Sequence, residues 1–398
     1  MTETHRGTPG EVFLAFLKLG LTSFGGPIAH LGYFRDELVL RRKWIDEAGY
    51  ADLVALCQFL PGPASSQVGF ALGLLRGGPW GALAAWAAFT LPSALLLVLF
   101  ASASSLFEGA LGSGALHGLK IVAVAVVAQA VWGMARSLTP DRERASIALA
   151  AVLVVVFAAG AIGQIAAILL GTVAGILLCR NGPASTEGRL SFRVPRGVGI
   201  ACLLLFFSLL ALLPLAAAAT ASQGVSLVDA FYRAGSLVFG GGHVVLPLLQ
   251  AAVVQPGWVT DDAFLAGYGA AQAVPGPLFT FAAYLGAVMG PAPNGLAGAA
   301  ICLVAIFVPG FLLLLGALPF WDEFRRRPLA QAAMRGANAA VVGILGTALY
   351  DPVWTSAILQ PHDFALALTG FILLVVWKIS PWIVVLLTTA GAMGLSLL

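Results

Sequence analysis

The sequence has little charge, and this scarcity limits what kind of protein it encodes. Only 10% of its 398 residues are charged, whereas 60% are hydrophobic, and the mean hydropathy is +0.95. Apolar runs of this number and length exceed what a soluble core can bury. The composition therefore excludes a soluble domain and predicts an all-α integral membrane protein.

Cysteine is also scarce, with Cys57, Cys179, Cys202 and Cys302 each standing alone in apolar sequence. No CxxC pair or Cys/His cluster occurs, so neither a disulfide framework nor a metal site is indicated. The P-loop, HExxH and GxSxG motifs are absent, as is a convincing dinucleotide fingerprint. We therefore expect no cofactor and no enzyme activity, and transport that is secondary or potential-driven. The polar first ten residues predict no cleaved signal.

What the sequence does contain is one stretch that occurs twice. The first copy runs from Phe16 to Gln67, and the second lies about 215 residues later. In the first block, Phe16, Lys18, Gly20, Phe24, Gly25 and Gly26 match Phe231, Arg233, Gly235, Phe239, Gly240 and Gly241. In the second block, Trp44, Gln58, Pro61, Gly62 and Pro63 match Trp258, Gln272, Pro275, Gly276 and Pro277. Such repeats, interrupted twice by Gly and Pro within apolar sequence, are typical of transporters whose broken helices form the binding site.

Apolar segments divide the chain into residues 1–179 as the N-terminal repeat, 180–225 as a linker with an extra helix, and 226–398 as the C-terminal repeat. Each repeat is predicted to have two re-entrant helical hairpins, because each piece around an interruption is too short to span. Four spanning helices should follow in each repeat. In the first they are Trp80–Ser102, Ala115–Ala135, Ala145–Phe157 and Ile162–Cys179; in the second they are Gly295–Leu318, Leu329–Tyr350, Phe364–Trp377 and Pro381–Leu397.

Lysine and arginine predict opposite orientations for the two repeats, since cytoplasmic loops collect these residues. In the first repeat the positive loops are the one after the first hairpin, the turn at Arg76 and residues 136–144; in the second, positive charge lies instead at residues 325–327 and Lys378. The extra segment Val198–Ala219 makes the number of spans odd, as inversion requires. The expected architecture is thus two inverted-topology repeats.

The four interruptions FGGP, LPGP, FGGG and VPGP are candidates for an anion site. Helix N-termini carry partial positive charge and free N–H groups, so converging tips would suit an anion. Close helix packing by small residues is the alternative explanation. The glycines concerned are Gly25, Gly26, Gly62, Gly240, Gly241, Gly242 and Gly276, whereas Gly171 is expected to face lipid.

Polar side chains near these tips extend the candidate site. Lys18 and Arg233 lie at equivalent positions two helical turns before a tip, where they could attract an anion or snorkel to the interface. Neutral donors that could bind an oxyanion, or act only as caps and interhelical bonds, are Gln58, Ser65, Ser66, Gln67, Gln272 and Thr280. His30, His243, Glu47 and Asp52 are candidates for a proton relay, with Glu47 alternatively capping its helix.

These motifs resemble the chromate ion transporters in their long-chain form with two homologous halves. The resemblance rests on SFGGPIAH, RKWIDE, QFLPGPASSQ and FTLP in one half and on VFGGGHVVLPLL, GWV, FLAGYGAAQAVPGPLFTFAAYLG and VPG in the other. It implies a multi-pass protein of the cytoplasmic membrane that exports chromate and confers resistance to it. Its signature positions are Gly25, Gly26, Pro27, Gln58, Pro61, Gly62, Pro63, Gln67, Gly240, Gly241, Gly242, His243, Gln272, Pro275, Gly276 and Pro277.

Chromate is a tetrahedral dianion close to sulfate in size and charge, and no residue type here separates the two. A sulfate-type or general oxyanion permease or channel is therefore the alternative function. The expected partners are the oxyanion and the lipid bilayer, with no nucleic acid. A homodimer is left open by the sequence.

Overall fold

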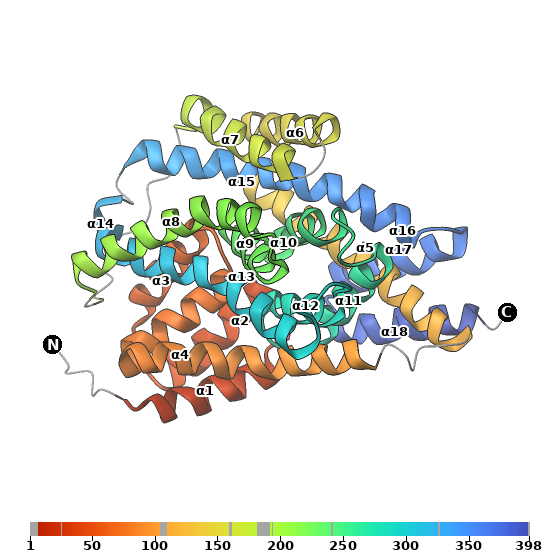
Figure 1. Ribbon diagram of the computed structural model, residues 1–398, viewed down its shortest axis with the longest axis horizontal. Coiled ribbons are helices and arrows are strands. Elements are labelled where there is room, and N and C mark those ends of the chain that lie inside the picture. Colours follow the sequence, from red (N-terminus) through yellow and green to blue (C-terminus); the bar gives the residue numbers. More distant parts are fainter. Residues whose placement is uncertain are drawn as a thin grey trace.

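The computed structural model describes residues 7–24, 26–103, 110–158, 161–180, 192, 194–239, 242–324 and 327–396 (Figure 1). Every regular element within these ranges is helical, which confirms the all-α class. Five of the helices in the described ranges are long and apolar enough to cross a membrane. The chain is therefore a multi-pass membrane protein.

In the first repeat, two helix pairs flank the two interruptions and three further helices follow. The first pair is α1 (Pro9–Thr22) and α2 (Gly26–Phe34), and α2 continues into the π-helix η1 (Arg35–Arg41). The remaining helices are α3 (Glu47–Phe59), α4 (Ala64–Ser102), α5 (Ala110–Leu138), α6 (Arg142–Phe157) and α7 (Ala161–Leu178). The extra helix is α8 (Arg196–Thr220).

In the second repeat, α9 (Gln223–Ser236) leads to the first interruption, and a short 3-10 turn and helix follow it. These are η3 (Gly242–Val244), α10 (Val245–Leu249) and the π-helix η4 (Gln250–Val254). The next elements are α11 (Asp261–Ala273), η5 (Leu278–Thr280), α12 (Phe281–Val288), α13 (Gly295–Ala317), η6 (Leu318–Phe320) and α14 (Trp321–Phe324). The chain ends with α15 (Pro328–Ala348), η7 (Leu349–Trp354), α16 (Thr355–Ala357), α17 (Pro361–Val375) and α18 (Pro381–Leu395).

Local sequence explains where the helices around the second interruption begin and end. The Asp46 carboxylate accepts a hydrogen bond from the Gly49 amide at 2.8 Å and so caps the start of α3. Asp46, and not Glu47 as the sequence suggested, therefore performs this capping. Pro61 ends α3 because it has no N–H to continue the helical bonds. Within α4, Gly78 has a φ of 66° and breaks the helix just before Pro79.

The expectation of four spanning helices per repeat is confirmed only for the longer helices. The described helices that reach spanning length are α4, α5, α8, α13 and α15 with its extension to Ala357. By contrast α6, α17 and α18 have 16, 15 and 15 residues, fewer than the roughly 20 that a bilayer requires. Most residues of these three helices are exposed or half-buried, so a spanning role for them stays a prediction.

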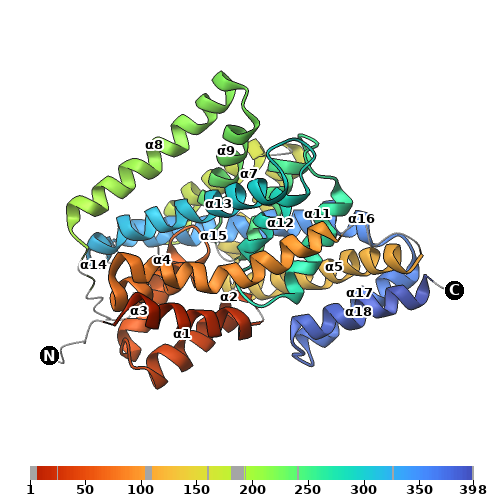
Figure 2. The same ribbon diagram turned by 60° about the horizontal axis from the view of Figure 1, so that its bottom comes forward.

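The two repeats exchange helices, as Figures 1 and 2 both show. Helix α15 of the second repeat packs against α6 and α7 of the first, and α5 of the first repeat packs against α17 and α18 of the second. Gly171 lies in the contact of α7 with α15: a Cβ there would come within 2.7 Å of the Gly336 carbonyl oxygen. The expectation that Gly171 faces lipid is therefore wrong, because it allows two helices to approach closely.

Helix α8 lies at the edge of the molecule, where it contacts α9 and α13 and leaves most of its surface exposed (Figure 2). Its apolar side chains are the kind that lipid would cover. Inside, a small core joins α1 to α4 with the end of α13, while a much larger core contains the hairpins of the second repeat. Thus α11 is central, whereas α3 is peripheral.

Candidate functional site

The two repeats meet at two equivalent backbone contacts between their interruptions. The Gly276 N–H donates to the Ser23 carbonyl at 2.9 Å, and the Gly62 N–H donates to the Val238 carbonyl at 2.7 Å. Gly62 matches Gly276, and Ser23 matches Val238, in the alignment of the repeats. We name these contacts the Ser23–Gly276 junction and the Val238–Gly62 junction. Each one joins the PGP turn of one repeat to the first interruption of the other.

Both junctions require glycine, since φ is 102° at Gly276 and 123° at Gly62. A Cβ at Gly276 would come within 2.8 Å of Ser93 Oγ on α4, and one at Gly62 within 3.1 Å of the Gly310 Cα on α13. Each turn therefore also abuts the proline-containing helix of the other repeat. Both N–H groups are already bonded in this conformation, so they are not the free donors that the sequence suggested.

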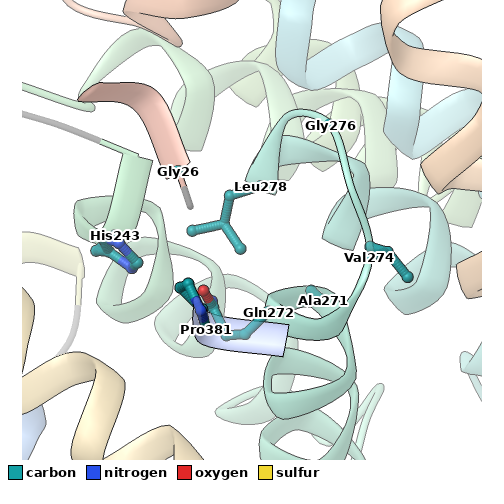
Figure 3. Close-up of a pocket in the computed structure, with 8 residues that line it drawn as sticks. All are labelled: Gly26, His243, Ala271, Gln272, Val274, Gly276, Leu278 and Pro381. Carbon is teal, nitrogen blue, oxygen red and sulfur yellow. The ribbon is translucent and has the colours of Figure 1, made fainter. Parts of the chain in front are cut away.

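A cavity lies beside the Ser23–Gly276 junction (Figure 3). Gly26 at the start of α2, Pro381 at the start of α18 and the end of α11 surround it. Its lining consists of Gly26, His243, Ala271, Gln272, Val274, Gly276, Leu278 and Pro381. The volume open to the centre of a water molecule is about 20 Å³, enough for roughly one ordered water. Two helix N-termini thus border a small space between the repeats.

The polar groups in this cavity are neutral donors. Gln272 Nε2 is buried and has no hydrogen-bond partner among the described residues. His243 Nδ1 lies 2.7 Å from the Tyr268 hydroxyl, and Nε2 lies 3.9 Å from where a Gly26 Cβ would be. The described lining includes no carboxylate. The cavity therefore offers hydrogen-bond donors and no opposing negative charge, which suits an anion.

At the Val238–Gly62 junction, a buried glutamine side chain packs against the PGP turn. Gln67 is fully buried there, and its Nε2 donates to the Pro61 carbonyl at 3.1 Å and to the Gly310 carbonyl at 2.9 Å. Gln58, the counterpart of Gln272, is exposed instead of lining a cavity. The equivalent glutamines therefore have different surroundings in the folded chain.

The hydroxyl groups after the PGP turns are buried near the junctions. Thr280 Oγ1 donates to the Pro277 carbonyl at 2.7 Å, and Ser65 Oγ lies 3.4 Å from His30 Nδ1. Ser66 Oγ is buried without a hydrogen-bond partner among the described residues. None of these three lines the cavity. Gly25, Gly240 and Gly241 lie outside the described residues, and Gly242 begins η3.

The predicted proton-relay residues are not connected to one another in the part of the chain that the structure describes. His30 is buried and its ring packs edge-on against Phe89. Glu47 pairs with Arg35 at an exposed position. Asp52 is buried and accepts a hydrogen bond from Trp321 Nε1 at 3.1 Å. A relay through His30, Glu47 and Asp52 stays a prediction, and these contacts give it no continuous path.

Lys18 and Arg233 are each bound to a carboxylate and do not line the cavity. Lys18 Nζ lies 2.8 Å from Glu37, which also accepts hydrogen bonds from Arg41 and Arg42. Burial alone would raise the pKa of Glu37, but the hydrogen bonds from these three cations outweigh it and lower the pKa to about 2. Arg233 pairs with Asp229 one turn earlier on α9. Around Glu37, three positive side chains face this one carboxylate, so the group has a net positive charge.

Sequence reasoning missed Tyr268, Pro381 and Glu37. Tyr268 precedes Gln272 by four residues, so helical spacing could have placed both on one face of α11. Pro381 comes from the far end of the chain, and no local pattern connects it with Gly26. Glu37 resembled an ordinary loop residue: helical spacing could have paired it with Arg41 and Arg42, whereas the fold brings Lys18 to it.

The chain is similar in sequence to known proteins. The family model described as chromate transporter matches residues 10–176 and 225–395. A probable chromate transport protein of Synechococcus elongatus is 30% identical over 391 residues, covering 94% of this chain and 93% of that protein. A chromate transport protein of Pseudomonas aeruginosa is 30% identical over 407 residues, covering 96% and 91%. No solved structure matches the chain. Because the family model spans both repeats and these relatives align along nearly the whole length, this chain belongs to the chromate transporter family.

Proposed function

We propose that this protein exports chromate across the cytoplasmic membrane and that the cavity at the Ser23–Gly276 junction binds the ion. The observation that carries the proposal is a cavity between the repeats that is bordered by helix N-termini and neutral donors. The relatives named above are chromate transport proteins, which supplies the substrate class. Export would confer resistance to chromate.

The chemistry of the cavity suits a dianion that must both enter and leave. The starts of α2 and α18 contribute partial positive charge, and Gln272 and His243 contribute N–H donors. A dense cluster of arginines would hold the ion too tightly for transport, whereas neutral donors keep binding moderate. The cavity now has room for about one water, so a five-atom oxyanion enters only when the repeats separate there.

Membrane potential is the proposed driving force. A dianion that leaves a cell with a negative interior gains about 4.6 kcal/mol per 100 mV, twice the value for a single charge. That energy sustains roughly a 10³-fold concentration ratio without a coupled ion. Lys18 would raise the local concentration of the anion by long-range attraction, because it belongs to a group of three cations around the single carboxylate of Glu37. Arg233 is paired with Asp229, so its charge would act on the anion mainly at short range.

The proposal includes opposite orientations of the two repeats in the membrane. The lysine and arginine pattern and the paired junctions support it. In a variant that lacks the four native cysteines, a cysteine at Leu40 should react only with a cytoplasmic reagent, and one at Gln255 only with an external reagent. Labelling of both positions from the same side would rule out inversion.

The test of the binding site uses the two equivalent glutamines. Gln272→Ala removes a donor that has no partner among the described residues. The KM for chromate uptake into inside-out vesicles should therefore rise about 10-fold, as for a lost hydrogen bond to a charged ligand. Gln58→Ala removes an exposed side chain and should change KM much less. Protein abundance in the vesicles is measured for both variants.

Equal effects of the two substitutions would show that the cavity is not the site. The same vesicles also decide between chromate and a broader oxyanion specificity. Sulfate that competes with chromate at equal concentration would favour the general oxyanion permease, and weak competition would favour a selective exporter. Cells that become more sensitive to chromate when they carry the gene would contradict export.

A further inference from the structure

One buried hydroxyl group next to the cavity has a single hydrogen-bonding neighbour. Tyr268 lies on α11, one turn before Gln272, and its side chain is fully buried. Its hydroxyl oxygen is 2.7 Å from His243 Nδ1, and this is its one hydrogen bond among the described residues. The function proposed above does not use Tyr268.

The direction of this hydrogen bond follows from counting protons. A neutral imidazole has one N–H, on either Nδ1 or Nε2. If Nδ1 carried the proton and donated it to Tyr268, the buried phenol hydrogen would lack an acceptor in the described part of the chain, which is costly. If Tyr268 donates to a bare Nδ1, both groups are satisfied. The pair therefore favours the tautomer with its proton on Nε2.

The Nε2 atom of His243 is directed toward the cavity. It lies 3.9 Å from the position that a Cβ on Gly26 would occupy, and Figure 3 shows the ring at the edge of the space facing Gly26 and Leu278. A protonated Nε2 offers the cavity a hydrogen-bond donor. A bare Nε2 would instead present a lone pair to an anion and repel it.

We propose that Tyr268 is a positioning residue, which binds His243 Nδ1 through its hydroxyl group and so keeps the Nε2–H donor directed at the transported oxyanion. The inference rests on the proposed binding role of the cavity. It assigns Tyr268 to substrate affinity and not to the conformational change, because the hydroxyl acts on the ligand only through His243. Loss of the hydroxyl should therefore raise KM while the maximal rate stays the same.

The experiment removes the hydroxyl and keeps the ring. The ring of Tyr268 packs edge-on against Phe281 with centroids 5.8 Å apart, and Tyr268→Phe preserves that contact. The KM for chromate in inside-out vesicles should rise about 5- to 10-fold, because part of the protein would then lack the proton on His243 Nε2 and its hydrogen bond to the ion. The maximal rate should stay within about twofold of the wild-type value. The matched control is Tyr284→Phe on α12, which removes a buried hydroxyl that donates to the Ala263 carbonyl at 2.9 Å.

A second measurement reports the tautomer directly. Protein labelled with ¹⁵N at its five histidines is examined by NMR in detergent, and the His243 signals are assigned by their loss in His243→Gln. The wild type and Tyr284→Phe should show a protonated Nε2 at His243. Tyr268→Phe should show a mixture of both tautomers, a change that loss of packing alone would not cause.

A third variant separates the hydroxyl from the imidazole. The side-chain amide in His243→Gln has a fixed N–H₂ donor near the position of Nε2 and needs no partner to set a tautomer. In that background, Tyr268→Phe should raise KM no further. An additional rise there would mean that Tyr268 acts independently of His243 and would overturn the inference.

The outcomes distinguish this inference from the proposed function. If Gln272→Ala and His243→Ala leave KM unchanged, the cavity is not the binding site and both proposals fail. If those variants raise KM while Tyr268→Phe behaves like Tyr284→Phe and His243 keeps its tautomer, the binding site stands and only the positioning role of Tyr268 is overturned.

Discussion

The two junctions of this transporter have the same backbone contact but different surroundings. At the Ser23–Gly276 junction a cavity lies beside the turn, with Gln272 and His243 on its wall. At the Val238–Gly62 junction, the amide of Gln67 lies against Gly62 and is bonded to two carbonyl groups. The repeats therefore share one backbone scaffold, and under the proposed function only the junction with the cavity would bind the ion.

The position of the hairpins in the fold explains this difference. Helix α11 is enclosed by α5, α12 and α18, so the end that carries Gln272 faces the interior. Its counterpart α3 packs mainly on α4 and η1 at the edge of the molecule, and Gln58 is exposed there. Identical residue types thus have different surroundings, because the exchange of helices between repeats encloses only one of the two hairpins.

The largest change in chromate flux is expected when a methyl group is placed in the cavity. Gly26 has a φ of 78°, and a Cβ there would meet only His243, at 3.9 Å. Gly26→Ala should lower chromate flux in vesicles by roughly 10²-fold, since displacement of a bound ligand by about 1 Å can have that effect. The added methyl would occupy the space that the ion needs.

Gly257→Ala is the matched control for backbone strain. Gly257 has a φ of 76°, and no described atom lies within 4 Å of where its Cβ would be. Alanine at Gly257 should therefore cause about 1–2 kcal/mol of backbone strain, as it should at Gly26. We expect this variant to transport at nearly the wild-type rate. Comparable losses of flux in both variants would mean that strain, and not occupation of the cavity, causes the effect.

At the Val238–Gly62 junction we expect a change in protein stability, with little change in transport. Gln67→Ala removes two buried hydrogen bonds and leaves two carbonyl groups without their donor. The protein in detergent should lose about 2–4 kcal/mol of stability, measured as a lower unfolding midpoint. The KM for chromate should change less than about twofold, as no substrate contact is lost.

Gln272→Ala should behave in the opposite way, with a raised KM and an unchanged midpoint, because its Nε2 has no partner to lose among the described residues. Unfolding scans and vesicle kinetics on the two variants would therefore sharpen the comparison. A KM raised as strongly by Gln67→Ala as by Gln272→Ala would show that both junctions bind the ion.

The smallest effects on KM are expected from Lys18 and Arg233, the cations at equivalent positions of the two repeats. Lys18→Ala leaves Glu37 with Arg41 and Arg42, and the Lys18 side chain is 52% exposed, so it should raise KM only about 2- to 5-fold at low salt. That increase should shrink as ionic strength rises, because salt screens exposed charges. A change in KM that salt does not alter would place Lys18 in direct contact with the ion.

Arg233→Ala should differ from Lys18→Ala in its effect on abundance. Asp229 is buried, and Arg233 is its ion-pair partner in the described structure, so the substitution leaves a buried carboxylate without that cation. The amount of protein in the membrane, measured by immunoblot, should fall for Arg233→Ala and stay normal for Lys18→Ala. Equal abundance would indicate that water reaches Asp229.

The class of the protein and its internal repeat follow from the amino-acid sequence alone. Long apolar runs require helices in a membrane, since the backbone must satisfy its own hydrogen bonds there. The matched Gly and Pro positions identified the four interruptions, because glycine is needed where φ is positive and proline ends a helix. The interruptions at Gly62 and Gly276 are local features, so residue types alone revealed them.

Which interruptions meet, and which of them border a cavity, depends on how the helices pack in three dimensions. The Ser23–Gly276 contact, the filling of its counterpart by Gln67 and the approach of Pro381 to Gly26 join residues that are far apart in the chain. The burial of Gly171 likewise depends on a neighbouring helix. Local sequence encodes a helix and its ends, but the environment of a side chain depends on long-range packing that composition and spacing do not contain.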